Sequence, residues 1–544
     1  MAVTLVQGAL IALVSLSLWH LVRPFFIKSP LANIPGPQRT SLWKGNFHQI
    51  FNRRGWNFHR ELAKKYGNVV KVHGLFGREE LFVMDPLALH HIVVKDQYVY
   101  EETDSFILGN GLIFGIGLLS TRGDHHKKQR KMLNPVFSLA HMRRLIPIFN
   151  PIVIQLQDVL SEQVRLAGGK DVDIMKWLSR AALELIGQAG LGYTFHALDD
   201  TKTDSYSETL KRYQPANHNV FLFRQFLTYL LKIGTPKFRR AVVEAIPWKP
   251  VQELIIVSDK LQSISKQIYD TKVAAMEKGD EEHQIGRGKD IMSVLLKANR
   301  DASEEDRLPE EEIFGQMNGF IQAAHETTTS SIARVLTLLS QHQDIQDKLR
   351  EAVTSARKEA GGEFDYESLM TIPYLDAVCR ETLRVYPPVT HLVRIARKDI
   401  SLPLMWPITS ADGKSAISEV PVKKNTNVIM SILGANLHKE IWGPDAEEWK
   451  PERWLEPLPE SVGKAHMPGV YASMMTFLGG GRACIGFKFA EMELKLVLAT
   501  LLHTFKFQPG SKEIYWNMGG VANPVVKDSP TNYPELPLKV TMLL

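Results

Sequence analysis

The amino-acid sequence predicts a mainly helical protein with small β-sheets and a single N-terminal transmembrane helix. Three observations support this fold class. Long amphipathic patterns, with apolar residues at intervals of three and four, dominate the chain and indicate helices. Short runs rich in Val, Leu and Phe between Tyr66 and Asp85, separated by Gly74 and Gly77, predict a β-hairpin. Residues 1–22 contain no Asp, Glu, Lys or Arg and are strongly apolar.

This apolar segment is long enough to cross a membrane. At about 1.5 Å per residue, a helix over residues 1–22 would span roughly 33 Å, which is enough for the hydrocarbon core of a bilayer. A cleaved signal peptide is the alternative, but it would have a basic start and a shorter apolar run. Here the charges, Arg23 and Lys28, follow the apolar run. We therefore interpret residues 1–22 as a transmembrane signal anchor, with the following domain in the cytoplasm.

Residues 23–37 are interpreted as a stiff proline-rich hinge, because Pro30, Pro35 and Pro37 cannot continue a helix. After this hinge the sequence shows no second linker of comparable strength, no internal repeat and no long low-complexity stretch. We therefore expect one domain over residues 38–544, and a chain of this length readily buries a sizeable core.

Charge and cysteine content exclude some classes of protein. The net charge of +6 is only mildly basic and no recognisable nucleic-acid module accompanies it, so we expect no nucleic-acid partner. The sequence has only two cysteines, Cys379 and Cys484, which argues against a disulfide framework and is typical of a reducing compartment. Cys379 lies in a predicted helix without a glycine loop, so we interpret it as a packed thiol.

A glycine-rich loop over residues 477–486 contains Cys484 and precedes a strongly apolar helical pattern over residues 487–505. The helix N-terminus and the charge of Arg482 both favour a thiolate at Cys484. The alternatives are a small buried hydrophobic residue or a phosphate-binding loop. A phosphate loop would contain Gly-Lys-Ser or Gly-Lys-Thr, and a zinc site would need more Cys or His at short spacing. Cys484 is therefore a candidate metal ligand.

A long helical pattern runs from Pro309, which suits a first-turn position, to about Gln343. Its middle contains an acid followed by an alcohol, Glu326 and Thr327, after the small residue Ala324. Consecutive β-branched residues are poor choices for helix stability, whereas an acid beside an alcohol can hold waters and relay protons. A polar helix surface is the alternative interpretation.

The order Phe-x-x-Gly-x-Arg-x-Cys-x-Gly closely resembles the haem-thiolate loop of the cytochrome P-450 family. It is filled here by Phe477, Gly480, Arg482, Cys484 and Gly486. The resemblance extends over nearly the whole chain after the hinge and is strongest to membrane-bound fungal members. It implies the cytochrome P-450 fold and a haem b (iron protoporphyrin IX) cofactor with Cys484 as the axial iron ligand. A thiolate ligand favours splitting of the oxygen–oxygen bond.

The resemblance also implies contacts to the haem propionates. The family places a Trp and an Arg one helical turn apart at the propionates, and here His126 stands in the tryptophan position and Arg130 in the arginine position. Arg394 and Arg482 match further propionate-binding arginines. The neighbouring lysines are expected to form part of a basic surface that docks an acidic reductase.

Two further motifs match the family. Ala324 replaces the usual glycine in the family's Ala/Gly-Gly-x-Asp/Glu-Thr-Thr/Ser pattern, in which Glu326 and Thr327 would be catalytic. Glu381 and Arg384 share a helix face and resemble the family's buried Glu-x-x-Arg, with Arg453 as third partner.

Residues 101–117 are expected to form a glycine-punctuated loop that covers the distal face of the haem. The substrate-pocket candidates, for any one of which ordinary packing stays an alternative, are Phe114, Ala323, Val389, Thr390 and Val521.

The implied activity is that of a monooxygenase that inserts one atom of O2 into a hydrophobic small molecule, such as a terpenoid, steroid, fatty acid or xenobiotic. Its electrons would come from NADPH through NADPH-cytochrome P-450 reductase, with cytochrome b5 as an optional donor. We expect a single-pass protein in the lipid of the endoplasmic reticulum membrane. A haem-thiolate isomerase or dehydratase and a non-catalytic haem-binding protein stay open, although the intact Glu326 and Thr327 argue against both.

Overall fold

The computed structural model describes residues 7–8, 15, 29–199, 205–280 and 283–543. Apart from residues 7, 8 and 15, the predicted transmembrane segment lies outside these described residues. Within the described ranges, no helix combines the length and the apolar character needed to cross a bilayer.

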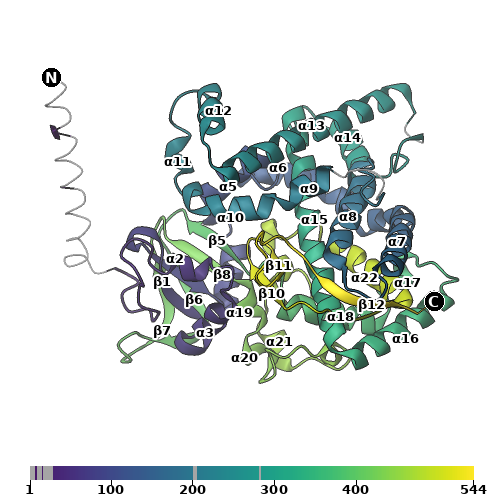
Figure 1. Cartoon of the computed structure of the whole chain (residues 1–544). Helices are drawn as coiled ribbons and strands as arrows, with labels where there is room; N and C mark the ends of the chain where they lie inside the picture. The colour runs from purple at the N-terminus through teal and green to yellow at the C-terminus, as the bar shows by residue number, and fades with distance from the viewer. Residues whose placement is uncertain (1–6, 9–14, 16–28, 200–204, 281–282, 544) are drawn as a thin grey trace.

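The described part of the chain is mainly helical with small sheets, as the sequence predicts, and it contains four sheets (Figure 1). The helices are α2 (Phe47–Ile50), α3 (Trp56–Tyr66), α4 (Pro86–His90), α5 (Asp104–Phe114), α6 (Gly123–Leu133), α7 (Leu139–Ala167), α8 (Ile174–Leu185), α9 (Ser205–Lys211), α10 (Tyr213–Arg224), α11 (Leu227–Leu230), α12 (Pro236–Ala245), α13 (Lys249–Lys278), α14 (Ile291–Asp301), α15 (Glu310–Gln341), α16 (Gln343–Glu359), α17 (Tyr366–Met370), α18 (Pro373–Val385), α19 (Ile432–Asn436), α20 (Lys439–Trp442), α21 (Glu460–Lys464) and α22 (Phe487–Thr504).

The largest sheet has the strand order β1-β2-β8-β5-β3, and the others pair β4-β12-β9, β6-β7 and β10-β11. The strands are β1 (Val69–His73), β2 (Glu79–Val83), β3 (Tyr100–Glu102), β4 (Val172–Asp173), β5 (His391–Ala396), β6 (Ile400–Thr409), β7 (Ala416–Val422), β8 (Asn427–Ser431), β9 (Phe505–Pro509), β10 (Ile514–Met518), β11 (Ala522–Val526) and β12 (Pro537–Met542). β1 and β2 pair antiparallel, with Val69 opposite Val83, so the predicted hairpin is confirmed.

The main hydrophobic core forms where α7, α8, α15 and α22 pack together. α15 passes through the middle of the molecule, and α22 lies close to it (Figure 1). The apolar pattern predicted for residues 487–505 is confirmed as α22, and the long pattern after Pro309 is confirmed as α15. Pro309 is the N-cap residue rather than a first-turn residue, because its backbone is extended. A second core lies where the largest sheet meets the β6–β7 pair and the short helices α4, α19, α20 and α21.

Residues 101–117 are mostly helical, so the predicted loop is wrong there. Thr103 accepts a hydrogen bond from the backbone N–H of Phe106 at 3.2 Å and caps the N-terminus of α5. The helix ends at Gly115, whose φ of 89° only glycine adopts readily. The glycines inside the segment, which suggested a loop, are accommodated within the helix because neighbouring elements pack closely against it.

The described part of the predicted hinge lies against the largest sheet. Leu31 and Ile34 are buried in the second core, and the backbone N–H of Lys71 in β1 donates to the Pro35 carbonyl at 2.8 Å. These contacts attach residues 29–37 to the sheet.

Candidate functional site

The loop that carries Cys484 is held by close approaches between backbone segments. Gly480 has φ of 68°, and a Cβ atom there would lie 1.7 Å from the carbonyl oxygen of Val93, in the π-helical turn His91–Lys95. A Cβ at Gly479 would lie 1.6 Å from the carbonyl oxygen of Pro468. These two glycines therefore make room for the protein's own backbone.

Two contacts fix the ends of this loop. The backbone N–H of Cys484 donates to the Phe477 carbonyl at 2.8 Å, and the Phe477 ring contacts the rings of Tyr471 and Phe487. Gly486 is the N-cap residue of α22, and a Cβ there would meet only Phe137 at an ordinary 3.8 Å. The loop therefore delivers Cys484 at a fixed position just before the helix.

The Cys484 side chain is accessible, although protein atoms surround it closely. It therefore faces an opening inside the molecule rather than the outer surface. Burial raises the pKa of the thiol, while the backbone N–H of Gly486 and the charge of Arg130 lower it. The bond from the Gly486 N–H, at the N-terminus of α22, favours the thiolate as expected, but the charge that does so is that of Arg130 and not of Arg482. In the protein chain alone, desolvation outweighs these two effects on the thiol.

Three predicted arginines converge on His126. Burial lowers the pKa of His126 to about 3, and the charges of Arg482, Arg130 and Arg394 lower it further. The ring is therefore neutral and keeps one N–H that can donate a hydrogen bond. The sequence placed Arg394 and Arg482 beside His126 and Arg130 only through the family resemblance, because these two arginines are far along the chain from α6.

The partners of these arginines leave an excess of positive charge. Arg130 Nη1 donates to the Ala483 carbonyl at 2.5 Å, and Arg482 Nη2 donates to the Thr121 carbonyl at 2.8 Å. Arg394 forms an ion pair with Glu102 at 2.8 Å. Buried cations are costly unless an anion accompanies them. Beside an accessible thiol, this charge fits a haem whose propionates supply negative charge.

Thr327 and Glu326 lie at the middle of α15, beside an accessible surface. Ala323 is exposed although most of α15 is buried, so an opening reaches the helix at this point. The Thr327 hydroxyl donates to the Ala323 carbonyl at 2.8 Å. Glu326 points elsewhere, because adjacent residues on a helix are about 100° apart. The acid and the alcohol are therefore near each other without being hydrogen-bonded.

The Glu326 carboxylate accepts a hydrogen bond from Gln214 of α10. Burial raises the pKa of Glu326 to about 7, and the bonds from Gln214 and Gln322 lower it. The carboxyl lines a cavity of about 30 Å³, which has room for a water molecule or two. Residues lining this cavity also include Ser179, Lys211, His325, Thr329 and Val521.

The substrate-pocket candidates are spread over several elements. Val521 shares the small cavity with Glu326, and Ala323 is exposed on α15. Phe114 is buried, with its ring centroid 5.4 Å from that of Tyr213. Thr390 is buried, and its hydroxyl is 3.0 Å from His391 Nδ1.

Val389 is partly buried and packs against the second core. Sequence reasoning missed Tyr213 and Gln214, because α10 carries no chemical motif and only its packing on neighbouring helices brings these residues to the site.

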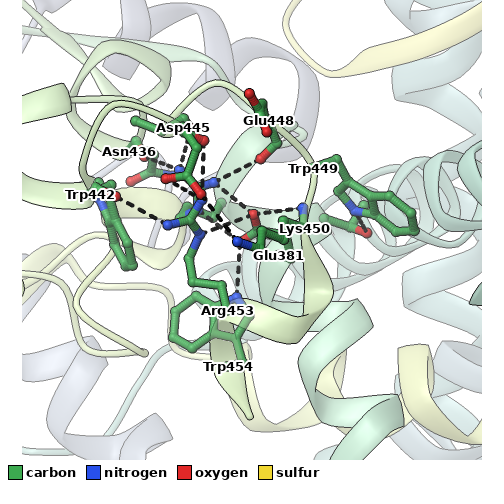
Figure 2. Close-up of polar contacts among 12 residues, drawn as sticks. Glu381, Asn436, Trp442, Asp445, Glu448, Trp449, Lys450, Arg453 and Trp454 are labelled. Carbon is green, nitrogen blue, oxygen red and sulfur yellow. Dashed lines mark hydrogen bonds and ion pairs between the residues drawn. The ribbon is translucent and has the colours of Figure 1, made fainter. Parts of the chain in front are cut away.

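A buried carboxylate joins α18 to the segment before the loop (Figure 2). Glu381 and Arg384 are fully buried, and their charges meet at 2.7 Å. Arg453 reaches the same carboxylate at 3.4 Å and also binds Asp445 at 3.0 Å. The indole N–H of Trp454 completes the group at 2.9 Å. The structure thus brings together the three residues that the sequence grouped.

We expect Glu381→Ala to destabilise the fold by about 3–5 kcal/mol, because it leaves the fully buried Arg384 without a carboxylate and Arg453 with Asp445 alone. The matched control is Glu460→Ala, which removes an exposed i,i+4 partner of Lys464 at 2.7 Å and should cost less than about 1 kcal/mol. Denaturant unfolding of the purified variants measures both, and haem absorbance per total protein should fall with Glu381→Ala. Equal effects of the two substitutions would contradict the assigned role of the network.

Gly480→Ala should cost about 1–2 kcal/mol for the left-handed backbone and about 1–3 kcal/mol more for the overlap with Val93. Gly168→Ala is the control, because Gly168 has φ of 57° and a Cβ atom there would meet nothing within 4 Å. It should therefore show the backbone cost alone. The difference in unfolding free energy between the two variants measures the close approach, and a difference near zero would argue against it.

Comparisons with known proteins agree with this geometry. Residues 35–524 match the family model described as "Cytochrome P450". Cytochrome P450 monooxygenase 91 of Postia placenta is 50% identical over 528 residues, covering 96% of each chain. Cytochrome P450 monooxygenase 212 of the same fungus is 49% identical over 94% of each chain. The ganoderic acid synthetase of Ganoderma lucidum is 40% identical over 96% of each chain. A match of this extent, at this identity, shows that the chain belongs to the cytochrome P450 family, as a monooxygenase.

Proposed function

We propose that this protein inserts one oxygen atom of O2 into a hydrophobic small molecule, with electrons from NADPH delivered by cytochrome P-450 reductase. The P450 family implies a haem cofactor and NADPH-derived electrons. The observation that carries the proposal is the accessible thiol of Cys484 beside the partly buried arginines Arg130 and Arg482. The candidate substrates are terpenoids, steroids, fatty acids and xenobiotics. One relative is named for the synthesis of an acid, so substrates oxidised to acids are included.

The haem, held as haem b, would supply the oxidising chemistry, and the protein would orient it and control access. Cys484 would bind the iron through its sulfur. Arg130, Arg394, Arg482 and the neutral His126 would bind the propionates. The bond from Arg130 to the carbonyl of Ala483 supports this role, because it ties the propionate side of the site to the loop of the thiol.

Glu326 and Thr327 would manage protons near the bound substrate. A carboxyl with a pKa of about 7 exchanges protons readily at neutral pH, and the adjoining cavity has room for water. Gln214 holds the Glu326 carboxyl at the wall of that cavity. The Thr327 hydroxyl, on the next position of α15, can exchange its present bond to Ala323 for one to a bound water or ligand.

The electron donor would dock on a basic surface around α6. Lys127 and Lys131 are exposed there, and the haem-side residues His126 and Arg130 lie on the same helix. An acidic reductase would be steered to this face by charge, and cytochrome b5 is a second donor of the same kind.

The proposed location is the endoplasmic reticulum membrane, with residues 1–22 as a single anchor, residues 23–37 as a hinge and the domain of residues 38–544 in the cytoplasm. The absence of charge from residues 1–22 supports an anchor. Exposed apolar side chains also gather around α11 and α12, where they suit contact with lipid. These side chains are Phe223, Tyr229, Leu230, Ile233, Phe238 and Val242.

Co-expression with a reductase in microsomes tests the proposed function. Oxidised product should form from members of the four substrate classes only when both NADPH and the reductase are present. Product that forms without NADPH would favour a haem-thiolate isomerase or dehydratase. Loaded protein that turns over no compound in any class would favour a non-catalytic haem protein.

Thr327→Ala should consume NADPH without proportional product, because protons would no longer be delivered in the correct place. Thr337→Ala is the control, since Thr337 makes the same hydroxyl-to-carbonyl bond on α15, to Ala333 at 2.8 Å. The ratio of product formed to NADPH consumed should fall several-fold in the first variant and stay near the wild-type value in the second. Full coupling in Thr327→Ala at unchanged turnover would remove Thr327 from the proton relay.

A further inference from the structure

Arg224, the last residue of α10, is a cation without a carboxylate partner. Its Nη1 donates to the side-chain carbonyl of Asn217, and it shares a hydrogen bond with the hydroxyl of Tyr213. Among the residues that the structure describes, none supplies an acid within ion-pair distance of this guanidinium. The group is partly buried, and burial lowers its pKa. A cation held in this way loses hydration without gaining a counter-charge.

The Arg224 guanidinium lies between α10, which carries it, and α5. α10 packs against α5 and α13 (Figure 1). At Gly109 of α5, a Cβ atom would lie 2.1 Å from Nη2 and 2.4 Å from Nε of Arg224. Only glycine leaves the space in which the guanidinium lies against the helix. The contact with Arg224 therefore accounts for a glycine at position 109, although glycine is less favourable than alanine inside a helix.

The same face of α10 leads from Arg224 to the centre of the site. Tyr213 binds Arg224 with its hydroxyl and contacts the ring of Phe114, a predicted pocket residue. The next residue, Gln214, binds Glu326 on α15. Because Asn217 and Tyr213 both bond the guanidinium, the charge lies back along α10 toward its Tyr213 end, where Tyr213 contacts Phe114.

We propose that Arg224 binds the carboxylate of a hydrophobic acid and that amphipathic carboxylic acids are therefore substrates of this protein. The inference deepens the proposed function and rests on it. A planar guanidinium pairs with a carboxylate through two parallel hydrogen bonds, which gives both strength and orientation. Asn217 and Tyr213 hold the guanidinium in place, and the apolar residues between it and α15 would contact the body of the ligand.

The competing interpretation is that Arg224 only ties α10 to α5. The two interpretations differ in what the charge does. A structural tie would affect acids and uncharged ligands equally. A carboxylate-binding residue would affect only the acids, because an alcohol of the same shape has no negative charge to pair.

The test measures ligand binding to the haem-loaded, full-length protein, by the change in haem absorbance when ligand displaces water. The probes are two matched pairs, hexadecanoic acid with hexadecanol and oleanolic acid with erythrodiol. In the wild-type protein at pH 7.5, at which a carboxylic acid is ionised, at least one acid should bind more tightly than its alcohol. Arg224→Gln should raise the Kd of that acid about tenfold or more and change the Kd of the alcohol less than threefold.

Three further variants make the outcome decisive. Arg224→Lys should restore part of the acid affinity, because it keeps the charge. Gly109→Ala should weaken acid binding selectively, because its Cβ displaces the guanidinium. Arg212→Gln is the matched control, since Arg212 is exposed just before α10, and it should leave both affinities unchanged.

The inference is overturned if the wild-type protein prefers neither acid, or if Arg224→Gln weakens acid and alcohol equally. It is also overturned if Arg212→Gln has the same effect as Arg224→Gln. Binding is measured without NADPH or a reductase, so this result is separate from turnover. A protein that binds acids through Arg224 but forms no NADPH-dependent product would contradict the proposed function and leave the carboxylate site standing.

Discussion

The position of the Cys484 thiol depends on a loop, residues 477–486, that close contacts with neighbouring backbone segments hold in place. Gly479 and Gly480 allow this loop to approach Pro468 and Val93 more closely than any side chain would permit. The bond from the Cys484 N–H to Phe477 then closes the loop just before α22 begins. A short, rigid loop of this kind holds the Cys484 sulfur in one position, and a side chain that binds a large, flat cofactor needs such a fixed position.

Electrostatics explain why the rest of the site surrounds this loop. The charge of Arg130 lowers the pKa of the Cys484 thiol, and its guanidinium donates a hydrogen bond to the carbonyl of Ala483. Arg482 and Arg394 add positive charge around His126. Farther from the site, Glu381 neutralises two arginines in the protein interior. One arginine cluster thus has its counter-charge within the protein, and the other fits the negative charge of a bound group.

The sequence was most informative where a pattern is local. The β1–β2 hairpin, α15 and α22 follow from the spacing of apolar residues, which reflects the geometry of each element. The error at residues 101–117 arose because Gly109 and Gly111 suggested a loop, whereas Gly109 accommodates Arg224 from another helix. At Cys484 the sequence indicated the contribution of the helix N-terminus but not the opposing effect of burial, because burial is decided by tertiary packing.

The motifs for the candidate site were recognisable because their spacing is short, as in residues 477–486 and the pair Glu326 and Thr327. The convergence of His126 with three arginines, and the contact between Gln214 and Glu326, depend on long-range packing that no local pattern encodes.

The most direct test of the central claim is the spectrum of the reduced protein with carbon monoxide, compared between the wild-type protein and Cys484→Ser. The account predicts the red-shifted band of a thiolate-ligated haem in the wild-type protein and its loss in the variant, with α-helical content unchanged. A wild-type protein that binds haem without this band, or a Cys484→Ser variant that retains it, would contradict the account.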